Sequence, residues 1–387
     1  MKRSIKPGDD VDYSLYNFDT HEFVCSSHIN DNYIRKFINE KGSIGKCTYC
    51  NKNRTVIELA EVLKVIVVGI DYLFEDPVEF KYLDNEAETG FDGDNFYFDE
   101  LFYERLGLEI KNSKLSEHIF KYLDNISLYY YKDEYGSYSE YLSDLWQLFK
   151  YTVKHRARFV FYYKEIFREN HLSDPVSILN DVQASIQNFK LFRKISNTEK
   201  LYRCRQHKTT NEIKEAKDLS SPPDHLCKAY NRMSAVGISM FYCSTDEKLC
   251  IQEVVDNKDL SKPFFTTAYF TSKSDLNLVD LTNLPSIPSI YDAENNKYID
   301  TIYFLQEFIE DISKPIDPLD TLIEYIPTQV VTEYIRFNPV LNADGIIYPS
   351  SKGEALENIV LFKNQEECLD ELVFNEHSIT TKQIIKV

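Results

Sequence analysis

Apolar side chains recur at helical spacing in two stretches of the first half of the chain. Within each stretch they repeat three or four residues apart, so they fall on one face of a helix. Both patterns therefore predict helices with one buried face. The apolar positions are Leu142, Leu145, Trp146, Phe149 and Val153 in the first stretch, and Ile178, Val182, Ile186 and Phe189 in the second.

Two further helix starts are indicated by local sequence. Thr55 and Glu58 form the T-x-x-E pattern of a capping box ahead of an apolar run. Asp174 followed by Pro175 suits an N-cap and the first residue of a helix. The acidic segment 84–100 is predicted to be a solvated loop. The first half of the chain is therefore expected to be mainly helical.

The pattern changes near residue 195. Short segments rich in β-branched and aromatic residues then alternate with short helical ones, among them SMFYCS, PFFTTAYF, LNLVDL and NIVLF. This alternation predicts an α+β domain over residues 195–372. The sequence has no P-loop and no GxGxxG opening a helix, and it has only eleven glycines. A Rossmann dinucleotide fold therefore has no support.

Length and pattern together predict a chain of several parts. With 387 residues, the chain is longer than one average domain. We expect a flexible tail over residues 1–20, a small metal-binding module over 21–53, a helical domain over 54–194, the α+β domain over 195–372 and a C-terminal extension over 373–387.

Composition and charge narrow the class of protein. Apolar residues make up 43% and charged residues 27% of the chain, as in globular proteins with a real core. The net charge of −18 gives no long-range attraction for nucleic-acid phosphates, so no nucleic-acid partner is expected, although a local basic cleft is compatible with it. The most apolar run, Val62–Phe74, contains Lys64 and Asp71 and is too short to span a bilayer. No membrane association is expected, and without an apolar leader the protein is predicted to be cytoplasmic.

Four cysteine and histidine residues near the start of the chain are spaced for a metal ion. Cys25 and His28 form one pair and Cys47 and Cys50 another, each with two residues between its members. Zinc prefers four nitrogen or sulfur ligands in a tetrahedron, and a two-residue gap lets one tight turn supply two of them. The pattern predicts a structural Zn²⁺ site. A catalytic zinc is less favoured because four protein ligands leave no open position, and four unrelated side chains are the ordinary alternative.

Five residues of the second half have side chains suited to a nucleotide site. Arg203 and Arg232 can each form bidentate hydrogen bonds with phosphate oxygens. Tyr242 offers a flat face and a hydroxyl. Glu253 can stabilise a developing oxocarbenium ion on a ribose, and Ser350 can hold a phosphate, a sugar or a nucleophile. Together they fit cleavage of an N-glycosidic bond in a dinucleotide.

Each of these residues also has an ordinary explanation. An arginine and a glutamate in a strand–helix unit more often form a surface salt bridge than an active site. Tyr242 is one of 28 tyrosines and is most simply a core residue, and the YPSS segment around Ser350 is most simply a turn. Spacing alone therefore favours a structural role for this set.

The order of the motifs resembles the RES domain family, named for its Arg, Glu and Ser. LYRCR, NRMSAVGISMFYCSTDEKLCIQEV, YIPTQVVTEYIR, DGIIYPSSKG and NIVLF follow one another over about residues 198–365. The first half resembles the HEPN/RES N-terminal domains, which carry a metal-binding cysteine pattern and helices. His28 stands where many relatives would have cysteine, an exchange that zinc tolerates. The R-x4–6-H nuclease pattern of some helical domains of this kind is absent, so no ribonuclease activity is expected.

The resemblance implies an ADP-ribosyltransferase-like fold and a protein that degrades NAD by hydrolysis or phosphorolysis of its nicotinamide–ribose bond. Proteins of this family serve as toxins and are commonly neutralised by an antitoxin, so a regulatory partner and a role in defence are expected. Carried over residue by residue, Arg203 and Arg232 would clamp the pyrophosphate, Tyr242 would lie near nicotinamide, Glu253 would stabilise the ribosyl cation and Ser350 would orient ribose, phosphate or the nucleophile.

Two other functions stay open on the sequence. A mono-ADP-ribosyltransferase would use the same arginine, tyrosine and glutamate but pass the ribosyl group to a macromolecule. A non-enzymatic interaction protein would keep the fold without the reaction, although the intact set of site residues argues against such decay. The sequence does not specify the acceptor of the ribosyl group, and it leaves open whether the chain forms a homo-oligomer.

Overall fold

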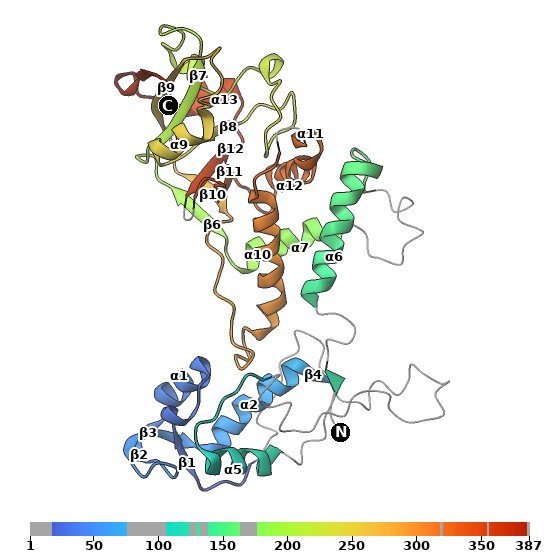
Figure 1. Ribbon diagram of the computed structural model, residues 1–387, viewed down its shortest axis with the longest axis vertical. Helices are drawn as coiled ribbons and strands as arrows, with labels where there is room; N and C mark the ends of the chain where they lie inside the picture. The colour runs from blue at the N-terminus through green and yellow to red at the C-terminus, as the bar shows by residue number, and fades with distance from the viewer. Residues whose placement is uncertain are drawn as a thin grey trace, which may run out of the picture. The chain divides into compact units, whose positions relative to one another are not determined.

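The computed structural model describes residues 18–75, 106–123, 130–131, 138–162, 176–317, 320–353 and 356–384 (Figure 1). Packing divides the chain into two compact units. The N-terminal unit comprises residues 1–141 together with 286–303, and the C-terminal unit comprises residues 142–285 together with 304–387. The expected loop over 84–100 and the expected N-cap at Asp174 and Pro175 lie outside the described residues, as does most of the expected tail.

The N-terminal unit is built on a small antiparallel sheet with strand order β1-β3-β2. Isoleucine, leucine and valine side chains of helices α1, α2 and α5 form its core together with Tyr291, which comes from the segment 286–303. Helix α2 is apolar on most of its surface, which is typical of a helix that is buried all round. The elements of this unit are β1 Phe23–Cys25, α1 Asn32–Lys41, β2 Ser43–Lys46, β3 Asn53–Glu58, α2 Leu59–Leu73, β4 Phe74–Glu75, α5 Ser113–Leu123 and β5 Tyr130–Tyr131.

The predicted capping box at Thr55 and Glu58 is wrong. Both residues lie in strand β3, and helix α2 begins only after it. The backbone amide of Ala60 is instead satisfied by the hydroxyl of Thr20, which lies 40 residues earlier in the sequence, at 3.0 Å. The β-branched run from Thr55 favours a strand, and its pairing with β1 and β2 outweighs the local capping pattern.

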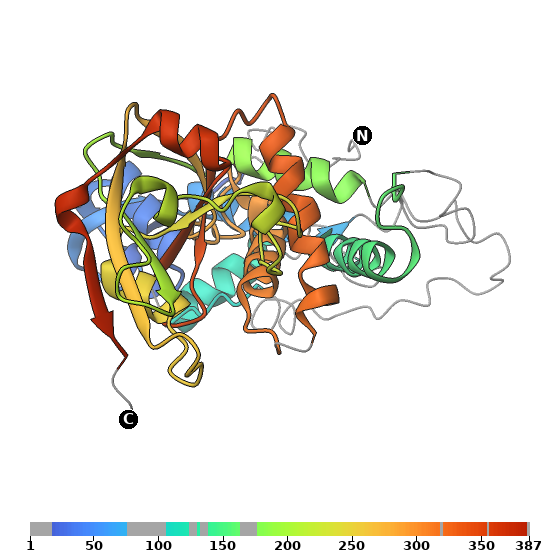
Figure 2. The ribbon, with the colours of Figure 1, turned by 90° about the horizontal axis from the view of Figure 1, so that it is seen from above.

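The C-terminal unit contains a five-stranded sheet and a four-stranded sheet. Strand order in the first is β6-β10-β11-β12-β8, in which only the β10–β11 pair is parallel. In the second, β9 pairs with β7 on one side and with β13 and β14 on the other (Figure 2). The strands are β6 Phe192–Ile195, β7 Leu201–His207, β8 Phe241–Cys243, β9 Phe264–Ser272, β10 Leu276–Asp280, β11 Gly345–Pro349, β12 Glu357–Leu361, β13 Leu372–Phe374 and β14 Thr380–Gln383.

Both faces of the five-stranded sheet are buried. Successive residues of β12 point to opposite faces, so Ile359 and Leu361 join the core shared with the second sheet, whereas Val360 joins the core shared with the helices. This two-sided burial accounts for the continuous apolar runs of its strands. The helices of this unit are α6 Tyr138–Tyr151, α7 Ser177–Asn188, α8 Ala216–Leu219, α9 Glu247–Val254, α10 Ile299–Ser313, α11 Thr321–Glu324, α12 Ile326–Phe337 and α13 Gln365–Glu371, of which α6 and α10 begin in the N-terminal unit.

The compact units do not follow the expected domain boundaries. The two apolar stripes predicted from periodicity lie on α6 and α7, as expected, except that Val153 lies in the π-helical turn Thr152–Arg156 after α6 and Phe189 is the C-cap of α7. They pack with α10, α12 and the five-stranded sheet rather than with the N-terminal helices. Residues 373–383 are part of the second sheet rather than an extension, because β13 and β14 pair with β9. The metal-binding module likewise runs on to Glu58, since β3 is the central strand of its sheet.

Within the described residues, no helix is long and apolar enough to cross a membrane. Helix α2, the most apolar stretch, has 15 residues and belongs to a hydrophobic core.

At Gly69, helix α2 packs against Tyr291 of the segment 286–303. A Cβ atom at residue 69 would lie 2.5 Å from Cε1 of the Tyr291 ring. Tyr291 is buried, and its hydroxyl donates a hydrogen bond to the carbonyl oxygen of Leu106 at 2.8 Å, so the ring is held at both ends. The contact needs a residue without a side chain at this position of the helix.

We predict that Gly69→Ala destabilises the N-terminal unit. Helix propensity alone would stabilise α2 by about 1 kcal/mol, but overpacking a tight core site costs about 1–3 kcal/mol. Hydrogen exchange of α2 in the variant and the parent measures the difference. In a Tyr291→Leu background, where the ring is gone, the same substitution should be neutral or stabilising. A single Gly69→Ala variant with slower exchange than the parent would contradict the prediction.

Candidate functional site

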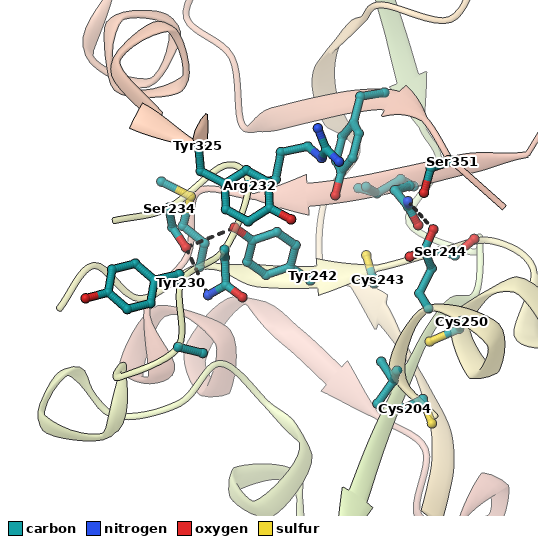
Figure 3. Close-up of a pocket in the computed structure, with 18 of the residues that line it drawn as sticks. Cys204, Tyr230, Arg232, Ser234, Tyr242, Cys243, Ser244, Cys250, Tyr325 and Ser351 are labelled. Atoms are coloured by element: carbon teal, nitrogen blue, oxygen red, sulfur yellow. Dashed lines mark hydrogen bonds between the residues drawn. The ribbon is translucent and has the colours of Figure 1, made fainter. Parts of the chain in front are cut away.

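A cavity of about 580 Å³ lies in the C-terminal unit beside the edge of the five-stranded sheet. Its walls come from β7, β8, α9, β11 and β12, from the loop between Pro222 and Met240, and from the segment between Ser313 and Tyr325 (Figure 3). Four of the five residues predicted from the sequence line it, namely Arg203, Arg232, Tyr242 and Glu253. The fifth, Ser350, is bonded to one of them.

Glu253 is held by two side chains that come from different strands. The hydroxyl of Ser350, just after β11, donates to Oε1 of Glu253 at 2.5 Å, and Nδ2 of Asn358 on β12 donates to the same oxygen at 2.8 Å. Ser350 also accepts a hydrogen bond from the backbone amide of Lys352 at 3.0 Å. The one hydroxyl proton of Ser350 is therefore committed to the carboxylate, and the serine acts here as a clamp on Glu253.

The position of Glu253 follows from how α9 begins. The side chain of Asp246 caps the helix by accepting from the amide of Leu249 at 3.0 Å, which fixes the first turn. Glu253 lies two turns later, in the last turn of this eight-residue helix. At the preceding corner, Ser244 donates to the carbonyl oxygen of Glu357 at 3.0 Å and so ties the approach to α9 to the start of β12. One short helix and two strand ends thus determine where the carboxylate lies.

Arg203 is a half-buried cation in the wall of the cavity. Its guanidinium donates to the carbonyl oxygen of Tyr242 and lies 4.8 Å from the centre of the Phe241 ring. Burial lowers the pKa of this guanidinium, yet arginine keeps its charge at neutral pH. Arg205, two residues further along β7, instead donates to the carbonyl oxygen of Asp218. The strand therefore directs one arginine into the cavity.

Arg232 is fixed by the C-terminal end of α10. Its Nη1 donates to the carbonyl oxygen of Ile312 at 2.6 Å and its Nη2 to that of Lys314 at 2.8 Å, while the guanidinium carbon lies 5.2 Å from the centre of the Tyr325 ring. These carbonyl groups carry the negative end of the helix dipole. Two of its five N–H donors are used in this way, and the other three make no hydrogen bond to the residues that the structure describes, so a ligand can take them.

The turn that carries Arg232 is itself held from α12. Nε2 of Gln329 donates to the carbonyl oxygen of Asn231 at 2.8 Å and to that of Ser234 at 3.2 Å, on either side of the arginine. A single amide group thereby fixes the backbone on both flanks of Arg232.

Neither arginine forms an ion pair with a carboxylate in the part of the chain that the structure describes, and neither does Glu253. The ordinary explanation of an Arg–Glu surface salt bridge is therefore not what the fold contains here. Half-buried cations without a carboxylate partner are suited to an anionic ligand.

Tyr242 lies between the arginine turn and the carboxylate. Its hydroxyl shares a hydrogen bond of 2.9 Å with the hydroxyl of Ser234, and burial raises its pKa. Tyr348, from β11, also lines the cavity and is 6% exposed, and burial likewise raises its pKa. Both hydroxyls therefore stay protonated at neutral pH and are available as hydrogen-bond donors rather than as bases.

The structure adds Tyr325, Tyr348 and Gln329 to the residues selected from the sequence. All three lie inside motifs quoted for the family resemblance, in YIPTQ and IIYPSS. Their residue types carried no signal of their own, because tyrosine occurs 28 times in this sequence. The contact of Gln329 with a turn almost a hundred residues earlier is visible only once the chain is folded.

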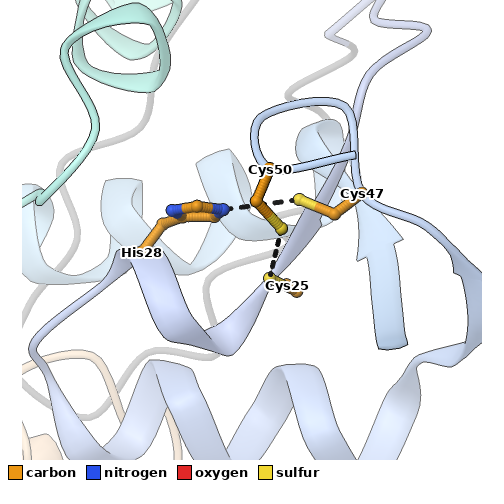
Figure 4. Close-up of side chains that lie close together, drawn as sticks. All are labelled: Cys25, His28, Cys47 and Cys50. Carbon is orange, nitrogen blue, oxygen red and sulfur yellow. Dashed lines mark hydrogen bonds between the residues drawn. The ribbon is translucent and has the colours of Figure 1, made fainter. Parts of the chain in front are cut away.

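The predicted metal ligands also come together, in the N-terminal unit. One ligand atom each from Cys25, His28, Cys47 and Cys50 lies within 4.8 Å of every other (Figure 4). The two sulfur atoms of Cys25 and Cys50 are 3.9 Å apart, and the sulfur of Cys47 is 3.5 Å from Nε2 of His28. With zinc–sulfur bonds of about 2.3 Å, the edge of a tetrahedron is about 3.8 Å. The donor set and its spacing therefore fit a four-coordinate zinc ion.

Comparison with known proteins gives two matches to family models. HEPN/RES N-terminal domain 1 matches residues 40–166, and the RES domain matches residues 200–380, which confirms the resemblance seen in the motifs. Searches of curated proteins and of solved structures gave no match. A RES domain implies an enzyme that acts on NAD. The chain therefore belongs to the proteins in which a HEPN/RES N-terminal domain 1 precedes a RES domain.

Proposed function

We propose that this protein cleaves the bond between nicotinamide and ribose in NAD and passes the ADP-ribosyl group to water or phosphate. The observation that carries the proposal is the Glu253 carboxylate, fixed by Ser350 and Asn358 on a cavity that also holds two arginines. An anionic diphosphate and a developing ribosyl cation need groups of opposite charge at separate places. This cavity offers both.

The reaction needs little proton transfer at the start. As the glycosidic carbon–nitrogen bond breaks, its electron pair moves to the positively charged pyridinium nitrogen, and neutral nicotinamide leaves. The ribose is left as an oxocarbenium cation, which the Glu253 carboxylate would stabilise electrostatically. Water or phosphate then bonds to the same carbon, with loss of a proton in the case of water, to give ADP-ribose or its 1-phosphate ester.

Ser350 and Asn358 contribute to this step through Glu253. Their two donors hold one oxygen of the carboxylate, so the other oxygen can face the ribose. A group fixed in advance stabilises charge in the transition state without reorganising during the reaction. Arg203 and Arg232 would hold the diphosphate, with Tyr242 near the nicotinamide.

A toxin or defence role follows from the same reaction. A cell that loses its NAD cannot carry out hydride transfer, so an uncontrolled enzyme of this kind stops growth. Expression of the parent protein, but not of an inactive variant, is therefore expected to lower cellular NAD.

We predict that Glu253→Gln lowers NAD turnover about a hundredfold or more, the usual scale for losing one electrostatic contact in the transition state. The substitution keeps the size of the side chain and removes its charge. Nicotinamide release from NAD by the purified full chain measures the effect. Glu247→Gln is the matched control, because Glu247 lies on the same helix but bonds Thr267 outside the cavity. Equal turnover of NAD by Glu253→Gln and the parent would remove the role assigned to Glu253.

Products identify the acceptor. With labelled NAD, hydrolysis yields free ADP-ribose, phosphorolysis yields an ADP-ribose phosphate only when phosphate is added, and transfer to a macromolecule leaves label on protein or nucleic acid from a lysate. The proposal expects one of the first two products. Label found only on macromolecules would show mono-ADP-ribosyl transfer instead. NAD that stays intact would favour the alternative of a non-enzymatic interaction protein.

We also propose that Cys25, His28, Cys47 and Cys50 bind one structural Zn²⁺. The four ligands saturate a tetrahedral ion, so it would stabilise the small sheet rather than take part in the reaction.

Cys47→Ser is therefore expected to remove the bound zinc and speed hydrogen exchange across β1, β2 and β3, because the sheet loses the ion that joins its turns. Elemental analysis of freshly purified protein and hydrogen exchange measure the two effects. Cys368→Ser, which removes an equally buried thiol from the C-terminal unit, should leave the zinc content unchanged. Parent protein purified without zinc would refute the assignment.

A further inference from the structure

The cavity has a second end, opposite the carboxylate. Figure 3 shows Tyr230 at one side of the labelled residues and Ser351 at the other, with Arg232 and Tyr242 between them. Ser351 follows directly on the clamp serine Ser350, so this side of the cavity is the Glu253 end. The cavity therefore extends from the carboxylate, past an arginine, to a tyrosine.

The loop that carries Tyr230 contributes uncharged and mostly apolar side chains to the wall of the cavity. They are Pro222, Leu226, Ala229 and Tyr230. Leu226 and Tyr230 are 53% and 50% exposed, in contrast to Tyr348 of β11, another lining residue of the cavity, which is 6% exposed. An exposed leucine and an exposed aromatic ring at the mouth of a polar cavity would gain by burial under a flat, neutral group.

The loop that carries these residues is held in place before any ligand binds. Ser239 donates to the carbonyl oxygen of Pro222 at 2.6 Å, and the amide of Gly237 donates to that of Cys227 at 2.8 Å. On the other side of Tyr230, the carbonyl oxygen of Asn231 accepts from Gln329. A wall fixed by such bonds can offer a binding surface without the entropic cost of ordering a loop.

We infer that this end binds the adenine ring of the substrate, stacked on Tyr230 and bordered by Leu226. The inference rests on the proposed function, because it places the ribosyl carbon at Glu253 and the diphosphate at Arg232. Adenine is a neutral heteroaromatic ring joined to that diphosphate by one ribose, so it suits an uncharged aromatic surface beyond the arginine. The consequence is a preference for the dinucleotide NAD over nicotinamide mononucleotide, which has the same scissile bond but no adenine.

The test compares cleavage of NAD and of nicotinamide mononucleotide by the full chain. Tyr230→Ala is expected to raise KM for NAD about tenfold, within the range measured for loss of one base–aromatic stack. The kcat for NAD should change little, and kcat/KM for the mononucleotide should stay within about twofold. Tyr230→Phe keeps the ring and should keep the NAD preference. Tyr303→Ala, a tyrosine of matched exposure at 49% outside the cavity, controls for general effects of the substitution.

Two outcomes would overturn the inference. One is an equal loss with both substrates, which would indicate a structural role for Tyr230. The other is an unchanged KM for NAD in Tyr230→Ala, which would place adenine elsewhere. Thermal melting of the variants shows whether the fold is retained, and Leu226→Ala gives a second readout, with a smaller rise in KM for NAD alone.

A failure of the proposed function gives a different result. If the parent protein cleaves neither substrate, the adenine site is tested by measuring the binding of AMP to the parent and to Tyr230→Ala by calorimetry. Binding that Tyr230→Ala weakens about tenfold would keep the adenine site without the reaction. No binding of AMP to the parent, or equal binding to both, would reject it.

Discussion

Burial of both faces of the five-stranded sheet is the constraint on which the rest of the C-terminal unit depends. Each strand has to present apolar side chains in two directions, so one face needs a layer of helices and the other needs a second sheet. Polar groups are left at the strand ends, where the backbone returns to solvent. The residues that hold the carboxylate lie there: Ser350 directly after β11 and Asn358 near the start of β12.

The local sequence pattern predicted secondary structure well where the conformation of a segment depends mainly on residues close to it in the sequence. The buried stripes of α6 and α7 and the strand–helix unit that carries Tyr242 and Glu253 all follow from periodicity. The capping pattern at Thr55 failed because strand pairing over a longer range outweighs a local signal. The compact units differ from the expected domains for a similar reason, since periodicity shows that α6 has a buried face but does not show which partner buries it.

The candidate site shows the same division. Residue types and their order selected Arg203, Arg232, Tyr242, Glu253 and Ser350. Folding brings the first four to one cavity and bonds Ser350 to Glu253. The sequence could not show which groups these side chains would form hydrogen bonds with. Ser350 gives its proton to a carboxylate instead of keeping it for a substrate, and Arg232 spends two donors on the end of a helix. A strongly acidic chain can thus still contain a cationic pocket, because a short-range arrangement of two arginines is independent of the net charge.

The division of the chain into units has a consequence for synthesis. Tyr291 completes the core of the N-terminal unit against Gly69, yet residues 142–285, which belong to the other unit, are translated between them. At typical rates of about 5–20 residues per second, the ribosome needs roughly 7–30 s to cover that interval. During this time the nascent N-terminal unit lacks the ring that fills the space over α2. The N-terminal unit emerges first from the ribosome, yet it can complete its core only after residues 142–285 of the other unit have also been translated.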